Sequence, residues 1–189
     1  VLKALKLGIC CFGENKVQEA EVKFQKISKG VEKRLVGNLQ SNKIKKAVAL
    51  FDSIDSVGSY SLAQKISKHC QKTGKTQRIL IQINTSEEKT KNGFLLSEKK
   101  EVLKCFSLPN LQVDGLMTIG PLTDNQNKRK KAFQSLKDFF SMINETLSPK
   151  KQAKELSMGM SDDFLLAIKE GSTMIRIGTN IFGSRKTNA

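Results

Sequence analysis

Short apolar runs alternate with longer amphipathic segments along this chain, and this order limits the folds that it can adopt. Strand-like runs cover residues 9–12, 34–37, 53–55, 79–84, 113–119, 155–158 and 174–178. Helical patterns lie between them, at residues 16–29, 42–50, 59–72, 97–106, 126–146 and 162–170. Several strand-like runs are rich in β-branched residues and lack polar alternation, as expected for a parallel sheet that helices cover. The order predicts an α/β protein, either a doubly wound sheet or a barrel.

The number of strand-like runs bears on this choice. A (β/α)8 barrel needs eight strands and typically about 250 residues, whereas this chain of 189 residues shows seven strand-like runs. The first residues, VLKALKLG, have the pattern of a helix end that Gly8 terminates. In a barrel of alternating strands and helices, such a helix follows a strand. We therefore expect a single domain over residues 1–189 that is incomplete at its N-terminus.

The charge and the apolar content bear on partners. The net charge of +15 could indicate a nucleic-acid partner. The lysines are scattered over predicted outer helices, however, and the chain has one Tyr and no Trp. A solvated basic surface is therefore favoured over a specific nucleic-acid site, with weak, salt-sensitive binding to polyanions. No apolar run approaches the roughly 20 residues that span a bilayer, so no membrane association is expected.

The cysteines and the single histidine do not predict a metal site. Cys10, Cys11, Cys70 and Cys105 lack a C-x-x-C spacing, and His69 has no partner at ligand spacing. Cys10 and Cys11 lie in an apolar run. We expect buried free thiols rather than disulfides or metal ligands.

Two strand ends near the C-terminus finish in small or hydroxylated residues: Ser157-Met158-Gly159 in one, Gly178-Thr179 in the other. In parallel barrels the active site lies at the carboxyl ends of the strands, where a phosphate often binds. Backbone N–H groups with two hydroxyls suit such a group. Turns of no function explain the same residues equally well. The pair Asp162-Asp163, which follows Ser161, is expected to cap the next helix rather than to catalyse acid–base chemistry.

Arg176 stands inside the otherwise apolar run at residues 174–177, and a purely structural role explains it less well. A guanidinium keeps its proton in proteins, and its burial without a partner is costly. An inward arginine therefore needs an acceptor, either an acid or a ligand atom. Three more strand ends carry amides or hydroxyls: FGEN at 12–15, GNLQSNK at 37–43 and QINTS at 82–86. Together these strand ends predict a site for a small anionic ligand.

Several motifs together resemble the pyridoxal-phosphate homeostasis protein family, whose members are single-domain relatives of the alanine racemase barrel. They extend in order over essentially the whole chain: FGENKVQE, VGNLQSNKIK, DSIDS, ILIQINTSEEKTKNGF, VDGLMTIGP, LSMGMSDD and GSTMIRIGTNIFGSR. The resemblance implies a TIM-type (β/α)8 barrel of the fold-type III class that holds pyridoxal 5′-phosphate (PLP), with its first strand lacking in this chain.

The resemblance also implies roles for particular residues. The phosphate would be held by Ser157, Gly178 and Thr179, with Met158 close by and Asn15 beside the cofactor. Arg176 would face the pyridine nitrogen. Because an arginine does not give up its proton, that nitrogen should stay unprotonated, which makes the ring a weaker electron sink.

The chain departs from the family pattern at two places. The family carries its Schiff-base lysine in a motif resembling AVSK upstream of FGEN, and nothing here matches that motif, so we expect this lysine upstream of Val1. Lys3 and Lys6 lie on the predicted helix tail and do not take its role. The chain as given is therefore expected to bind PLP only weakly and reversibly. Arg34 and Leu35 replace a frequent His-Phe pair, which is expected to affect only local packing.

Three classes of function follow from these observations. The first is a non-catalytic PLP binder that buffers the cofactor and delivers it, with PLP-dependent apoenzymes as recipients. The second is a PLP-dependent amino-acid racemase, which would pair a lysine with a tyrosine base, although Tyr60 opens a predicted outer helix. The third, a nucleic-acid binder, rests on charge alone. We expect a cytoplasmic protein, and a mitochondrial location stays open.

Overall fold

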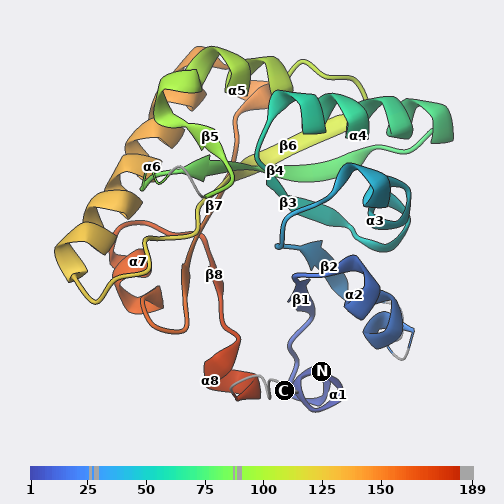
Figure 1. The fold of residues 1–189 in the computed structure, drawn as a ribbon, viewed down its shortest axis with the longest axis horizontal. Coiled ribbons are helices and arrows are strands. Elements are labelled where there is room, and N and C mark those ends of the chain that lie inside the picture. The colour runs from blue at the N-terminus through green and yellow to red at the C-terminus, as the bar shows by residue number, and fades with distance from the viewer. Residues whose placement is uncertain (26, 28–29, 87, 89–90, 184–189) are drawn as a thin grey trace.

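A parallel β-sheet forms the centre of the computed structural model, which describes residues 1–25, 27, 30–86, 88 and 91–183. The strands that it describes are β1 (Cys11–Glu14), β2 (Glu32–Leu35), β3 (Ser53–Val57), β4 (Gln77–Asn84), β5 (Phe94–Leu95), β6 (Leu111–Met117), β7 (Glu155–Met160) and β8 (Met174–Arg176). They pair in the order β1-β2-β3-β4-β6-β7-β8, and β5 pairs with β4. The sheet curves into a ring whose two end strands, β1 and β8, do not pair with each other (Figure 1).

Helices surround this ring on its outside (Figure 1). The α-helices of the described residues are α1 (Leu2–Lys6), α2 (Val17–Phe24), α3 (Ile44–Leu50), α4 (Tyr60–Thr73), α5 (Lys99–Cys105), α6 (Gln126–Thr146), α7 (Phe164–Lys169) and α8 (Thr179–Phe182). Short 3-10 turns are η1 (Ser41–Lys43), η2 (Leu96–Glu98) and η3 (Pro149–Lys151). The predicted fold is confirmed as a nearly closed α/β barrel.

Helix α4 shows how the sequence sets these elements. The Ser59 hydroxyl caps its first turn, accepting the N–H of Leu62 at 3.2 Å. Gly74 ends it in the left-handed conformation, with φ of 64°. One face of the helix is buried against the sheet, through residues such as Ile66 and Cys70. Both helix ends lie within two residues of the predicted bounds.

The predicted helix end at the N-terminus is also present. After α1, the N–H of Gly8 donates to the carbonyl of Leu5 at 3.0 Å, and the N–H of Ile9 donates to the carbonyl of Ala4 at 3.1 Å. Gly8 has φ of 84°, the left-handed conformation that such a cap requires. Lys3 and Lys6 are exposed on this helix.

The first strand corrects one expectation about the cysteines. Strand β1 runs from Cys11 to Glu14, two residues later than predicted, and its side chains alternate between exposed and buried. Phe12 is buried, whereas Cys10 and Cys11 are exposed. Successive side chains of a strand point to opposite faces, and β1 is an end strand with one unpaired edge. The predicted burial is therefore wrong for these two thiols, while Cys70 and Cys105 are buried and all four are free.

Strand β5 and helix α8 are among the elements that the sequence pattern missed. Strand β5 has two residues, Phe94 and Leu95, and no periodicity can be read from so short a segment. Within the described ranges, no helix is long and apolar enough to cross a membrane.

Candidate functional site

All strand pairs of the sheet are parallel, so the carboxyl ends of the strands meet at one end of the barrel. We call this end the mouth and the opposite end the bottom. Polar residues follow the strands at the mouth, among them Asn15 after β1, Thr118 after β6, Ser161 after β7 and Gly178 after β8. The parallel arrangement therefore gathers residues that are far apart in the sequence.

Arg176 reaches across two neighbouring strands at the mouth. Its Nη1 donates to the Ser157 hydroxyl at 2.7 Å, and its Nη2 donates to the carbonyl oxygen of Thr118 at 2.8 Å. No carboxylate of the described residues lies within ion-pair distance of it. Burial of the guanidinium lowers the pKa of Arg176, against the opposing charges of Asp55 and Asp163. Neutral acceptors thus hold the predicted inward arginine in place. Its positive charge has no carboxylate partner among the described residues and can interact with an anionic or acceptor group of a ligand.

Two backbone N–H groups converge next to this arginine. The N–H groups of Gly178 and Asn180 both point at the hydroxyl oxygen of Ser161, at 3.2 and 3.5 Å. The side-chain amide of Asn180 donates to the Ser161 carbonyl at 3.1 Å, which fixes the two segments together. A Cβ added at Gly178 would meet no atom within 4 Å, so the space in front of this backbone is open. We name Ser161, Gly178, Thr179 and Asn180 the cup.

The other predicted ligands lie in different surroundings. Ser157 is fully buried, and its hydroxyl accepts from Arg176, so this side chain positions the guanidinium. Met158 is fully buried in the hydrophobic core. Asn15 is exposed, and a Cβ at Gly37 would lie only 2.1 Å from its carbonyl oxygen. Glycine at position 37 therefore allows the ends of β1 and β2 to approach each other closely.

Sequence reasoning missed Ser161 and Asn180. It assigned Ser161 to the start of the next helix, together with Asp162 and Asp163. Helix α7 begins at Phe164 with Asp163 at its N-cap position, as predicted for this pair, but the Asp163 carboxylate makes no cap bond and instead accepts the N–H of Met160 at 2.7 Å. The predicted capping is therefore wrong in its detail. The position of Ser161, directly after a strand, was the available signal.

The remaining predicted strand ends close local turns. The Asn84 side chain donates to the carbonyl of Glu88 at 2.9 Å, and Ser86 donates to Asn84 at 3.1 Å. Ser41 opens η1, where its hydroxyl accepts from Lys65 at 3.1 Å. Asn84 and Ser86 therefore take part in a local turn, whereas the Ser41 hydroxyl bonds to α4.

A network of charged side chains fills the bottom half of the barrel. Arg34 on β2 donates to both carboxylate oxygens of Glu155 on β7, at 2.8 and 2.9 Å. It also donates to Asp55 on β3 at 3.1 Å, and Asp55 accepts from Ser53 at 2.6 Å. Because β2 and β7 are not neighbours, these side chains can meet only across the inside of the sheet. Arg34 therefore does more than affect local packing, which corrects the expectation for this position.

A second arginine extends this bottom network. Arg78 on β4 donates to Glu32 at 2.8 Å, to Asp114 at 2.5 Å and to Glu155 at 3.2 Å. Burial would raise the pKa of Glu32, but Arg34 and Arg78 outweigh it and hold that pKa below its usual range. Each arginine here faces carboxylates, unlike Arg176.

The carboxylates also change the acidity of groups around Arg34. Burial alone would lower the pKa of Arg34, but the hydrogen bonds that it donates to Glu155 and the charge of Asp55 raise that pKa above its usual range. Asp55 is fully buried, and that burial raises its pKa despite the nearby Arg34. The charged groups of the bottom network therefore have their partners within the protein.

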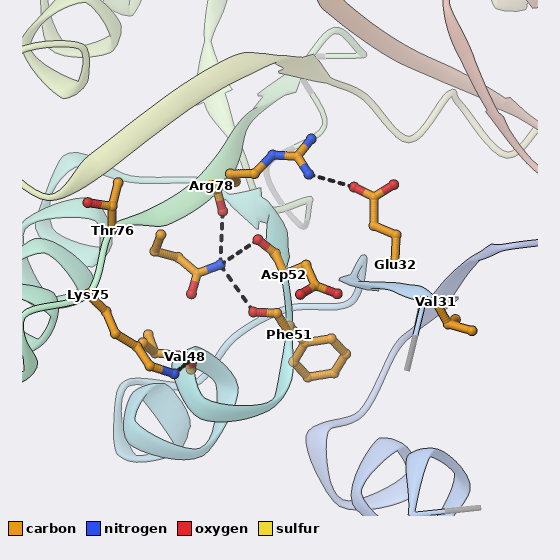
Figure 2. Close-up of a pocket in the computed structure, with 10 residues that line it drawn as sticks. Val31, Glu32, Val48, Phe51, Asp52, Lys75, Thr76 and Arg78 are labelled. Carbon is orange, nitrogen blue, oxygen red and sulfur yellow. Dashed lines mark hydrogen bonds and ion pairs between the residues drawn. The ribbon is translucent and has the colours of Figure 1, made fainter. Parts of the chain in front are cut away.

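A cavity of about 710 Å³ opens beneath the bottom network, and Figure 2 shows the residues around it. Its polar groups bond to the protein itself. The Gln77 amide donates to the carbonyls of Asp52 and Arg78 at 3.0 and 3.2 Å, and Lys75 donates to the carbonyl of Val48 at 3.3 Å. The Asp52 carboxylate accepts the N–H of Lys33 at 2.8 Å. The geometry thus favours the mouth, and not this cavity, as the functional site.

Comparison with known proteins agrees with this fold. The family model of the alanine racemase N-terminal domain matches residues 1–186. The pyridoxal phosphate homeostasis protein of Haemophilus influenzae is 39% identical over 98% of this chain and 79% of that protein. Its counterpart in Schizosaccharomyces pombe is 35% identical over 99% of this chain and 79% of that protein.

Solved structures show the same similarity. PipY of Synechococcus elongatus PCC7942, with PLP bound, has a TM-score of 0.81 at 34% identity, covering 91% of this chain and 81% of that chain. Alanine racemase of Clostridium difficile has a TM-score of 0.79 at 15% identity over 94% of this chain and 46% of that chain, which shows the fold alone. The chain belongs to the pyridoxal phosphate homeostasis protein family, built on the alanine racemase N-terminal domain.

Proposed function

We propose that this chain binds PLP reversibly at the mouth and acts in the homeostasis of that cofactor, by buffering and delivery. One observation carries the proposal: Arg176 is a partly buried cation that the described part of the chain provides with neutral acceptors and no carboxylate. A ligand with an acceptor atom at this point would complete its hydrogen bonds. PLP, which PipY holds in its solved structure, offers a ring nitrogen for that purpose.

The residues at the mouth fit the two ends of this ligand. Arg176 would donate to the ring nitrogen and, because it keeps its proton, would hold that nitrogen unprotonated. The cup would receive the phosphate, since an anionic oxygen can replace the Ser161 hydroxyl as acceptor of the N–H groups of Gly178 and Asn180. Thr179 would add a hydroxyl, and Asn15 would lie beside the ring.

Ser157 and Met158 would act differently from simple phosphate ligands. Ser157 would orient Arg176, because its buried hydroxyl already accepts from that guanidinium. Met158 would support the site from the core, where its side chain is fully buried. Bound PLP would supply a reactive aldehyde and an electron-withdrawing ring.

A non-catalytic role agrees with the surroundings of the tyrosine. Racemisation needs a second base within hydrogen-bonding reach of the substrate. Tyr60 is the only tyrosine in the sequence, and its ring lies 5.8 Å from the Nζ of Lys104 on α5, so it is engaged between outer helices. A racemase-like enzyme is therefore the second candidate function, and it would need a different base.

The recipients and the location complete the proposal. We propose PLP-dependent apoenzymes as the acceptors of the cofactor, because a weak electron sink suits storage better than catalysis. The chain would act as one PLP-binding domain over residues 1–189, in the cytoplasm.

Equilibrium titration tests the proposal. The purified chain is titrated with PLP and followed by absorbance, with pyridoxal, which lacks the phosphate, as the control ligand. We expect saturable binding of one PLP per chain, weaker binding of pyridoxal and competition by inorganic phosphate. Equal binding of PLP and pyridoxal would contradict the cup. Conversion of L-alanine to D-alanine by the loaded chain would instead support the racemase alternative.

A further inference from the structure

Helices α3 and α4 carry lysines without any acidic residue. Between residues 41 and 76 the sequence has seven lysines: Lys43, Lys45, Lys46, Lys65, Lys68, Lys72 and Lys75. The two acids of this stretch, Asp52 and Asp55, lie outside both helices, and both are bonded elsewhere. Within the described structure only Lys46 of the seven has an ion pair, with Glu21 at 2.9 Å. The positive charge here is therefore largely uncompensated.

The lysines of α4 share one face of the helix. Lys65, Lys68 and Lys72 follow each other at spacings of three and four residues and are exposed. The opposite face, with Ala63, Ile66 and Cys70, is buried in the core. At 1.5 Å per residue, the three ammonium groups extend over roughly 10 Å along the helix.

Helix α3 lies beside α4 and extends this face (Figure 1). Lys65, near the start of α4, donates to Ser41 at 3.1 Å, and Lys75, just after its end, donates to the carbonyl of Val48 at 3.3 Å. Both ends of α4 therefore contact the η1–α3 segment, so the helices run side by side in the same direction. The lysine face, as we name it, consists of Lys65, Lys68 and Lys72 of α4, with the exposed Lys45 on the neighbouring α3.

We propose that the lysine face binds the phosphate backbone of nucleic acid without sequence preference. Lysine is a flexible point charge that contacts phosphates as such, whereas reading bases needs planar or amide groups at base edges. None of the large hydrophobic side chains that are exposed in the structure lies between residues 41 and 76. A protein interface needs an apolar centre, and an interfacial membrane helix needs an apolar face to insert, so both partners fit less well.

A charge-matched pair of variants tests this proposal. The first variant replaces Lys65, Lys68 and Lys72 by Gln, and the control replaces Lys100, Lys128 and Lys131, which are exposed on α5 and α6. Both variants lose the same charge. Binding of a fluorescein-labelled DNA duplex of about 20 base pairs is followed by anisotropy from about 25 to 200 mM KCl, with two unrelated sequences.

We expect the loss of DNA binding to be larger in the α4 variant than in the control. The two sequences should bind the wild-type chain within about twofold, and the α4 variant should lower the slope of log K against log [KCl] by about 2.7, or 0.9 for each lost phosphate contact. The control should lower it by less than about 1. Equal losses in both variants would overturn the proposal, as would binding of phosphatidylserine vesicles but not of the duplex. Should the triple variant fail to fold by circular dichroism, Lys68→Gln alone is compared with Lys131→Gln. The slope should then fall by about 0.9 in the first variant and by clearly less in the second, and equal losses would overturn the proposal.

Discussion

The bottom and the mouth of the barrel both place arginines inside the sheet, but they treat the charge in opposite ways. At the bottom, Arg34 faces Glu155 and Asp55, with ion-pair distances of 2.8 and 3.1 Å. At the mouth, Arg176 donates only to a hydroxyl and a backbone carbonyl. Charges that are paired within the protein support the fold, whereas a partly buried cation without an acid is available to a ligand. This difference distinguishes the structural arginine from the binding one.

The largest expected effect comes from breaking the bottom network. Arg34→Leu would leave Asp55, which is fully buried, and Glu155 without their main partner. Removing one member of a buried ion pair typically costs about 3–5 kcal/mol. We expect a loss of this size in the free energy of unfolding, measured by urea denaturation. Lys46→Leu, which breaks an exposed pair with Glu21, is the control and should cost less than about 1 kcal/mol. Similar losses in both variants would remove the distinction between buried and exposed pairs.

Arg176→Leu, unlike Arg34→Leu, should weaken PLP binding and leave the free energy of unfolding nearly unchanged. Hydrogen bonds to charged groups contribute about 1.5–3 kcal/mol, so PLP should bind roughly 10- to 150-fold more weakly. The free energy of unfolding without PLP should change by less than about 1 kcal/mol, because the variant removes a partly buried charge that has no carboxylate partner among the described residues. Absorbance titration and urea denaturation measure the two quantities. Unchanged PLP affinity combined with a large loss of stability would place Arg176 with the structural arginines.

A smaller effect is expected from the cup. Ser161→Ala removes the hydroxyl on which the N–H groups of Gly178 and Asn180 converge. When the phosphate takes over these N–H groups, the Ser161 hydroxyl can donate to a phosphate oxygen, whereas the variant also removes a competing acceptor. The net loss should therefore be about 0.5–1.5 kcal/mol, which weakens PLP binding about 2- to 12-fold. Pyridoxal, which has no phosphate, should bind wild type and variant equally. An equal loss for both ligands would show that Ser161 shapes the mouth without contacting the phosphate.

The smallest expected effect is the pH-dependent contribution of Glu32 to stability. The pKa of Glu32 is held below its usual value in the folded chain, so its contribution to stability is present above its unfolded pKa and is lost as the pH falls through the folded pKa. Because Glu32 is about a third exposed, Glu32→Gln should cost no more than about 1 kcal/mol at pH 7. The difference between variant and wild type should shrink as the pH falls from 7 through the folded pKa, toward about pH 2. Urea denaturation at both pH values measures it, and a difference that persists at the lower pH would contradict the pairing.

The sequence predicted the fold better than it predicted the two charged regions. Strands covered by helices have a strong local pattern, and caps such as Ser59 and Gly8 are local as well, so both could be read directly. The inward direction of Arg176 was also expected, because an arginine in an apolar run needs a partner. Its actual acceptors, Ser157 and Thr118, come from two other strands, and their approach depends on the sheet.

The features that could not be predicted from the sequence depend on contacts between strands that are far apart along the chain. Arg34 and Glu155 are 121 positions apart and meet only because the sheet curves back on itself. A contact between such distant positions leaves no periodic pattern in the local sequence. Ser161 was misassigned for a similar reason: a serine before two aspartates has the pattern of a cap, and only the position of β8 shows that its hydroxyl faces Gly178.

Nuclear magnetic resonance of the ¹⁵N-labelled chain during PLP addition tests the contrast between the two regions most directly. The account predicts shifts of the backbone amides of Gly178 and Asn180 and of the Arg176 guanidinium, with little change at Arg34. Pyridoxal should shift Arg176 but leave the amides of the cup largely unchanged. Shifts at Arg34 and Arg78, with none at Gly178 or Arg176, would contradict the account and place the ligand at the bottom of the barrel.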